Sequence, residues 1–141
     1  MNASPPDVSA MDREYAGEFH TLRSARRDVV DWLNDVGADR ETTERASLIA
    51  SELATNAIQV APGVLYQLHA RAINPNTAAI AIRSRSAGAV PPPRGSWRPV
   101  DDLAIRGRGL SIVGALSDEV TVETDDGDVV VTAWFRIVST R

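Results

Sequence analysis

Apolar residues recur every three or four positions in two stretches near the beginning of the chain. The first stretch, residues 20–36, predicts an amphipathic helix with arginines on its polar side, and Gly37 marks its end. A second helix is predicted to begin near Asp39 or Thr42 and to continue to about Val60, where an Ala-Pro-Gly sequence stops it. The first part of the chain is therefore predicted to be mainly helical.

The remaining segments alternate between apolar and polar residues, as strands do, and turn signals separate them. The predicted strands span residues 13–19, 64–73, 78–86, 118–124 and 128–138. Asp126 and Gly127 form a typical hairpin turn between the last two strands, and a short helix is predicted at residues 110–116. This order of elements predicts the α+β class, with one antiparallel or mixed sheet and the helices on one face.

The length of 141 residues fits a single domain with a core of its own. Residues 1–11 are polar and contain proline, and they are predicted to be a disordered tail that precedes a domain at residues 12–141. The segment at about residues 86–106 is rich in proline, glycine and arginine. Loops of this length are usually functional or disordered. The interpretations are a lid over a ligand, a partner-docking loop and an irregular loop, and the sequence does not choose among them.

The amino-acid composition excludes several kinds of catalytic and binding site. The chain has no cysteine, and all 15 basic residues are arginine, which excludes disulfides, thiolate sites, a P-loop lysine and lysine-based catalysis. The net charge of -4 argues against non-specific nucleic-acid binding. No apolar run is long enough to span a membrane, and the first residues lack the pattern of a signal peptide. We therefore expect a soluble, cytoplasmic protein.

The second helix carries two polar residues, Glu52 and Asn56, beside its apolar side. Because they are four positions apart, they share one side of the helix and can point at one object. Asparagine is a poor helix former, and a carboxylate next to a core needs a partner or water. One interpretation is structural, with both groups serving local hydrogen bonds. The other is a cation site, in which Asn56 ligates Mg²⁺ and Glu52 orients or deprotonates a hydroxyl or water.

The sequence Arg-Gly-Arg-Gly-Leu at residues 106–110 precedes the short helix. Gly107 and Gly109 allow the backbone to approach a ligand, and the helix that follows offers free N–H groups to an anion such as a phosphate. Arg106 and Arg108 either add positive charge or face solvent. Glycines before a helix often serve only a turn, but the long loop upstream favours a nucleotide site.

Taken in order, the SELATNAI helix, the hairpin, the long loop, GRGLSIV and the final hairpin resemble the histidine-kinase-like ATPase superfamily over about residues 13–138. Within it, the chain is similar to the anti-sigma-factor serine/threonine kinases of bacterial partner switching. The resemblance implies a two-layer α/β sandwich with a mixed, mostly antiparallel sheet and ATP held between the helices and a lid. It also implies that Glu52 is the catalytic base, that Asn56 is the Mg²⁺ ligand and that Gly107, Gly109 and Leu110 hold phosphates.

One part of the family pattern is missing. The family carries an Asp-x-Gly-x-Gly box after the second strand, and its aspartate accepts a hydrogen bond from the adenine amino group. Here Ser84 stands in place of the aspartate, and Gly88 is the one remaining glycine of the box. A hydrogen bond to a charged group contributes about 1.5–3 kcal/mol, so its loss weakens ATP binding roughly ten- to a hundredfold. Adenine recognition is therefore the step that this sequence alters.

The resemblance implies an ATP- and Mg²⁺-dependent anti-sigma factor that regulates transcription. Such a protein binds a sigma factor, phosphorylates a serine of an anti-anti-sigma factor and forms a homodimer. The alternative is a non-catalytic partner-binding module that kept the fold and lost tight nucleotide binding. Glu52 and Asn56 favour the kinase, whereas Ser84 favours the module. An unrelated α+β domain with chance motifs would not account for the ordered match.

Overall fold

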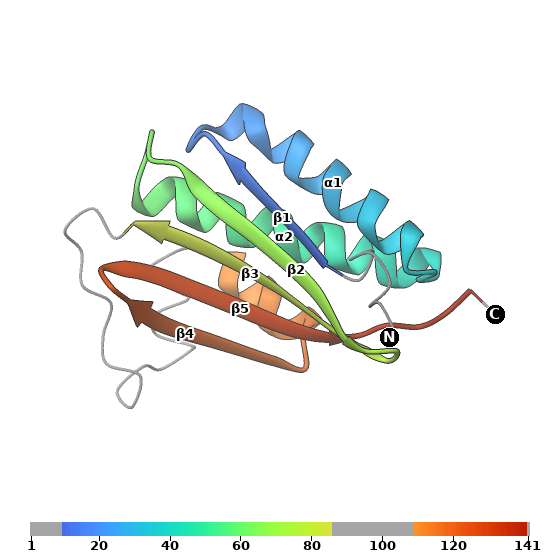
Figure 1. Ribbon diagram of the computed structural model, residues 1–141. Coiled ribbons are helices and arrows are strands. Elements are labelled where there is room, and N and C mark those ends of the chain that lie inside the picture. Colours follow the sequence, from blue (N-terminus) through green and yellow to red (C-terminus); the bar gives the residue numbers. More distant parts are fainter. Residues whose placement is uncertain (1–9, 86–108, 141) are drawn as a thin grey trace, which may run out of the picture.

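The computed structural model describes residues 10–85 and 109–140 (Figure 1). In chain order the elements are β1 (Ala10–Tyr15), the 3-10 helix η1 (Phe19–Thr21), α1 (Leu22–Asp35), α2 (Arg40–Val60), β2 (Tyr66–Asn74), β3 (Thr77–Arg85), α4 (Gly109–Leu116), β4 (Glu119–Asp125) and β5 (Asp128–Arg136). The described strands form one sheet in the order β1-β2-β3-β5-β4, and every neighbouring pair is antiparallel. None of the described helices combines the length and apolar character that crossing a bilayer requires.

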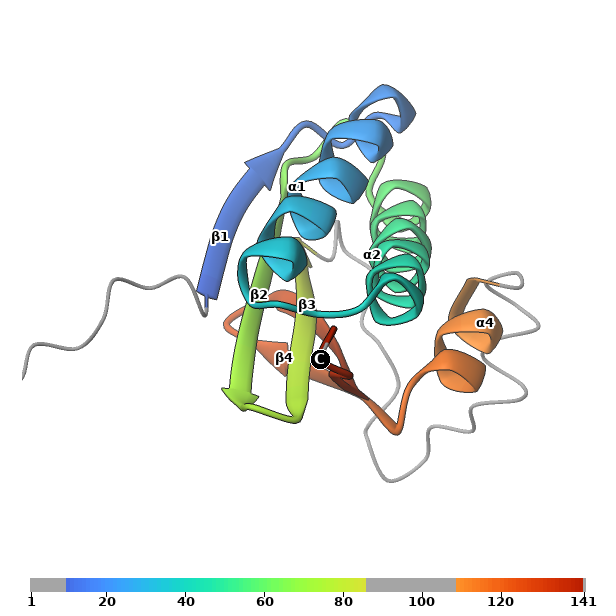
Figure 2. The same cartoon turned by 90° about the vertical axis from the view of Figure 1, so that its right-hand side faces the viewer.

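The described helices lie on one face of this sheet, with α2 between α1 and α4 (Figure 2). The predicted α+β class with helices on one face is therefore confirmed, and the sheet is antiparallel rather than mixed in the described residues. The other face carries no described helix, which leaves one side of each strand toward the core and one side away from it. That division fixes which strand residues pack inside.

The beginning of β1 differs from the sequence prediction. The strand starts at Ala10 rather than residue 13, so two residues assigned to the disordered tail pair with β2 instead. Met11 and Tyr15 explain this register, because both are buried and lie opposite Ala70 and Tyr66. The strand ends at Tyr15, and the residues that follow turn into η1. The pairing partner is more than fifty residues away, and local alternation does not reveal it.

The core fills the space between the sheet and the helices. Its largest fully buried side chains come from α1, α2, α4 and the inner faces of the strands, and they include Val29, Leu33, Ile49, Leu53, Tyr66, Leu68, Ile80, Val113 and Phe135. The start of α2 is capped by Asp39, whose carboxylate accepts a hydrogen bond from the backbone N–H of Thr42 at 2.8 Å. Periodicity and capping together place α2 with its apolar side on the sheet.

Gly17 sits where the chain after β1 meets the connection between α2 and β2. The backbone N–H of Gly63 donates to the carbonyl of Gly17 at 2.9 Å, which joins the two segments. A Cβ atom on Gly17 would lie 2.2 Å from the carbonyl oxygen of Val64 and 2.8 Å from its nitrogen. Backbone atoms cannot swing aside as a side chain can. Close approach, rather than a positive φ, therefore requires glycine here.

We expect Gly17→Ala to lower the free energy of unfolding by about 1–3 kcal/mol, because the added methyl group forces the two segments apart. Gly114→Ala is the matched control, since Gly114 lies inside α4 with no atom within 4 Å of its Cβ position. That change should leave stability unchanged or raise it by up to about 1 kcal/mol. Urea denaturation followed by circular dichroism measures both. Equal stabilities for the two variants would contradict the close contact.

Candidate functional site

Glu52 and Asn56 lie one turn apart on α2, and both side chains are half-buried. The neighbouring Ser51 defines the side of α2 that meets α1, because its hydroxyl accepts a hydrogen bond from Arg26 of α1 at 3.3 Å. An α-helix turns about 100° per residue, so Glu52 and Asn56 lie on the flank of α2 that faces away from α1. Leu53, between them in sequence, points into the core. The acid and the amide thus share one flank, as their spacing predicted.

That flank is the one beside α4. Figure 2 shows α4 on the side of α2 opposite α1, and the two helices pack against each other. Val113 of α4 is fully buried in this contact region of the core. The helix that the sequence assigned to phosphate binding therefore lies next to the helix that carries the acid and the amide, although they are about fifty residues apart in sequence.

Only part of the predicted phosphate-binding segment can be placed. Gly109 is the first residue of α4, and the backbone of Leu110 lies in the first turn of that helix. The first four N–H groups of a helix have no partner within it, so this turn can donate to an anion. The other predicted residues of the site lie outside the described residues, namely Gly88, Arg106, Gly107 and Arg108. The predicted lid at residues 86–106 also lies outside them.

Ser84 is the next-to-last residue of β3, and it is 8% exposed. It lies between Tyr66 of β2 and Val129 of β5. Ile80 and Ile82 precede it at intervals of two and are buried on the helix side of the sheet, so Ser84 faces that side as well. The position that the sequence assigned to adenine recognition therefore points into the helix layer from the end of a central strand.

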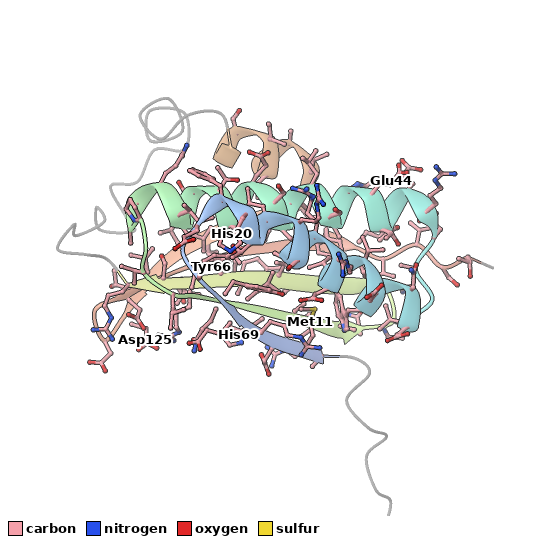
Figure 3. All side chains as sticks on the ribbon, turned by 90° about the horizontal axis from the view of Figure 1, so that it is seen from above. Met11, His20, Glu44, Tyr66, His69 and Asp125 are labelled. Carbon is pink, nitrogen blue, oxygen red and sulfur yellow. The ribbon has the colours of Figure 1, made fainter. Side chains whose placement is uncertain are left out.

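Tyr66 is a neighbour of Ser84 that sequence reasoning did not single out. Its ring is buried, and its hydroxyl shares a hydrogen bond of 2.9 Å with the hydroxyl of Thr21. Burial raises the pKa of Tyr66, so this phenol stays protonated over the ordinary pH range. Figure 3 shows Tyr66 between the sheet and the helices, whereas His69 lies on the other side of the sheet. The alternation of β2 signals the buried position, but its partner Thr21 follows from the fold alone.

The side-chain oxygens of Glu52 and Asn56 suit a Mg²⁺ ion that is bound together with a nucleotide. Within the described residues, no group of three or more acidic, histidine or cysteine side chains is placed to hold a metal ion. Mg²⁺ bound with a nucleotide needs only one or two protein oxygens, because phosphates and water complete its six ligands. The half-buried amide of Asn56 meets that requirement, and neither it nor Glu52 has a hydrogen-bonded side-chain partner among the described residues. The two side chains fit a nucleotide-bound Mg²⁺ rather than a metal site built by the protein alone.

Two pockets are bounded by described residues, and Ser84 lines one of them. One, of about 560 Å³, lies along α1 and α2 and is lined by Val30, Asn34, Ala38, Arg40, Thr43, Glu44, Ser47 and Thr140. The other, of about 290 Å³, lies at the end of the sheet and is lined by Glu14, Val64, Leu65, Gln67, Arg83, Ser84, Arg85 and Asp128. Glu52 and Asn56 line neither pocket. These hollows are therefore separate from the flank of α2 that faces α4.

Comparison with known families agrees with this arrangement. The family model for the histidine kinase-like ATPase domain matches residues 16–134, which include Glu52, Asn56, Ser84 and Gly109. The chain belongs to the histidine kinase-like ATPase family. Membership of this family implies ATP binding. The flank of α2 beside α4 is therefore a candidate nucleotide site.

A solved structure has the same fold as this ATPase domain. It is the crystal structure of the RsbU and RsbW domains of Rv1364c from Mycobacterium tuberculosis, with a TM-score of 0.62 and 16% sequence identity. The match covers 91% of this chain and 32% of that longer chain. At this identity the likeness establishes the fold only. No curated protein gives a significant match in sequence.

If Glu52 and Asn56 are kept for a ligand, they should contribute little to stability. Asn56→Ala is expected to leave the free energy of unfolding unchanged or to raise it by up to about 0.7 kcal/mol, because alanine favours a helix more than asparagine does. Leu53→Ala, on the buried side of the same turn, should cost about 2–5 kcal/mol. Thermal and urea denaturation of both variants without nucleotide test this. A loss for Asn56→Ala as large as that for Leu53→Ala would mean that the amide is structural.

Proposed function

We propose that this ATPase domain is an anti-sigma factor with serine/threonine protein kinase activity. The observation that carries the proposal is the pairing of a half-buried acid and amide, Glu52 and Asn56, on the flank of α2 that faces α4. A nucleotide bound there would have a cation ligand, a base and the first turn of α4 around its phosphates. The similarity of SELATNAI and GRGLSIV to the boxes of the anti-sigma kinases supports a serine or threonine hydroxyl as the phosphate acceptor.

In the proposed reaction, Glu52 accepts the proton of the acceptor serine hydroxyl as its oxygen attacks the γ-phosphorus of ATP. A new bond forms between the serine oxygen and the γ-phosphorus, and the bond from the γ-phosphorus to the β–γ bridging oxygen breaks. The products are a phosphoserine and ADP, and the proton remains on Glu52 until it is released to water. Asn56 would hold Mg²⁺, which when bound offsets the negative charge of the phosphate oxygens.

The remaining phosphate contacts would come from backbone N–H groups at the beginning of α4. Gly107, Gly109 and Leu110 are proposed to supply them, with Arg106 and Arg108 adding positive charge. Such donors are fixed before the reaction, so they do not need to reorganise when charge moves on to the leaving oxygen. The protein would therefore act mainly by holding the nucleotide and the acceptor in line.

The proposed partners follow from the same resemblance. They are a sigma factor, which the protein would sequester, and an anti-anti-sigma factor, whose serine it would phosphorylate. Partner switching of this kind regulates transcription without contact between this chain and nucleic acid, and the net charge of -4 agrees with that. It takes place in the cytoplasm, where ATP, Mg²⁺ and sigma factors are present together.

One observation favours a second function. Ser84 offers adenine a neutral hydroxyl where the family has a carboxylate, and it lies in a buried position at the end of β3. A domain with this change could bind its protein partners without turning over ATP. The second candidate is therefore a non-catalytic partner-binding module of the same fold, and nucleotide affinity separates it from the kinase.

Calorimetry with ATP and Mg²⁺ tests the proposal. The wild-type protein should bind ATP, and Asn56→Ala should bind it at least tenfold more weakly, because a Mg²⁺ ion bound with the nucleotide would lose its protein ligand. Glu52→Gln keeps the shape of the acid and should bind ATP normally while losing phosphate transfer to a cognate anti-anti-sigma factor. Absence of binding at millimolar ATP would exclude the kinase and leave the binding module.

Substitution of Ser84 tests how adenine is recognised. Ser84→Asp should bind ATP roughly ten- to a hundredfold more tightly, because the adenine amino group gains a charged acceptor. The same variant should be less stable without nucleotide, since the new carboxylate is buried there without a partner. Calorimetry and denaturation with and without ATP measure the two effects, and Ser84→Asn is the uncharged control. Tighter binding by Ser84→Asn alone, or by neither variant, would place adenine elsewhere.

A further inference from the structure

Ser84 belongs to a row of five side chains that crosses the inner face of the sheet from β1 to β4. Directly opposed residues in antiparallel strands share a face, and the strand pairings align Tyr15, Tyr66, Ser84, Val129 and Thr124 in that order. Figure 3 shows Tyr66 of this row between the sheet and the helices. Burial raises the pKa of both tyrosines, so their phenols are neutral over the ordinary pH range. The row therefore presents no charged group to a ligand on the helix side.

The hydroxyl protons of the two tyrosines are already used within the chain. Tyr15 donates to a carboxylate oxygen of Asp28 at 2.5 Å. Thr21 donates its only hydroxyl proton to the backbone carbonyl of Glu18 at 2.8 Å. In the 2.9 Å contact between the hydroxyls of Tyr66 and Thr21, Tyr66 is therefore the donor. Neither phenol has a proton left to offer to a ligand.

The hydroxyl of Ser84, by contrast, is free to bind a ligand. It has no hydrogen-bond partner among the described residues, although the residue is only 8% exposed. A buried polar group without a partner costs free energy, and native proteins rarely leave one unsatisfied. Thr124 also carries a hydroxyl, but it is exposed on the edge strand β4 and can bond to water. Ser84 is therefore the polar group of this row that a buried ligand would meet.

The charged residues around Ser84 lie on the other face of the sheet. Ser84 lines the pocket of about 290 Å³ together with Glu14, Arg83, Arg85 and Asp128. Arg83 and Arg85 alternate with Ser84 along β3, so their side chains leave the sheet on the opposite side. Glu14 does the same, because it directly precedes the β1 member of the row. Asp128 is on that side too, since it accepts a hydrogen bond from Arg83 at 2.9 Å. None of these charges takes the place of a carboxylate on the helix side.

We propose that the nucleotide site does not distinguish a 6-amino purine from a 6-carbonyl purine, so that it binds ITP about as well as ATP. This inference rests on the proposed function, which places the base of a nucleotide at Ser84. A serine hydroxyl has one rotatable proton and two acceptor lone pairs. It can accept a hydrogen bond from the amino group of adenine. After rotation it can instead donate one to the carbonyl oxygen at position 6 of hypoxanthine or guanine.

A carboxylate at this position would behave differently, because it only accepts hydrogen bonds. Opposite the 6-amino group of adenine it would find a donor. Opposite a 6-carbonyl group it would place two acceptors together in a buried position, which is unfavourable. A charged acceptor therefore selects adenine partly by rejecting the alternatives, and Ser84 lacks that repulsive element. The serine thus changes which nucleotides the site accepts as well as how tightly it binds ATP.

Calorimetry with the Mg²⁺ complexes of ATP and ITP tests this inference. ITP is the probe because it carries a carbonyl group at position 6 and lacks the 2-amino group of guanine. The wild-type protein should bind the two nucleotides with dissociation constants within about tenfold of each other. Ser84→Asp should bind ATP roughly ten- to a hundredfold more tightly and ITP at least about tenfold more weakly. Its preference for ATP should therefore be at least about a hundredfold greater than that of wild type.

Thr124→Asp is the matched control, because it adds the same charge to the same row at the exposed edge strand. Its ratio of ATP affinity to ITP affinity should equal that of wild type. Ser84→Ala removes the hydroxyl without adding a charge, and it should weaken the binding of both nucleotides by a similar factor of about two to ten. This variant also decides the case if Ser84→Asp does not fold, which circular dichroism reveals.

A wild-type protein that binds ATP and binds ITP more than about tenfold more weakly would overturn this inference and leave the proposed ATP site intact. So would an unchanged ratio of the two affinities in Ser84→Asp, or wild-type affinity of Ser84→Ala for either nucleotide. Binding of neither nucleotide at millimolar concentration would instead remove the proposed nucleotide site itself. The two failures are therefore distinguishable.

Discussion

The packing of the buried side of α2 on the sheet is the contact on which the other features depend. Ile49, Leu53 and Ala57 are almost completely buried, and they fix how the helix is rotated about its own axis. Once that rotation is set, Glu52 and Asn56 have only one direction to face, which is the flank beside α4. A shift of one residue in the apolar pattern would turn the acid and the amide toward the core or toward α1. The site is therefore positioned by hydrophobic packing, and the polar residues contribute little to holding themselves in place.

Sequence periodicity was sufficient for the parts of the fold that depend on near neighbours. It located α2 to within a residue or two, and the hairpin turn at Asp126 and Gly127, where φ is 54° and 86°, was also confirmed. It missed the start of β1, because Met11 enters the sheet through a partner on β2 that lies far away in the chain. It also missed Tyr66 as the neighbour of Ser84. Strand pairing creates both features, and no local pattern encodes the register between distant strands.

The two faces of the sheet differ in what they pack against. The inner face carries the core and, at the end of β3, the position of Ser84, so it serves α2, α4 and the proposed nucleotide. The outer face carries Trp134, and no described helix covers it. Because alternate residues of one strand belong to different faces, β3 and β5 contribute to both faces without sharing a side chain between them. Substitutions on one face can therefore leave the other face intact.

Ser84 shows how these constraints compete at a single position. The residue is buried beside the ring of Tyr66, where a carboxylate without a ligand would lose its hydration and gain no partner. A serine removes that penalty in the nucleotide-free protein, and it also removes the charged acceptor that would distinguish adenine. If Ser84 faces adenine as proposed, the serine would make the free domain more stable and lower its affinity for ATP. Selection for catalysis alone would not favour a substitution that lowers ATP affinity. A domain whose nucleotide-free form must persist long enough to hold a partner would benefit from it.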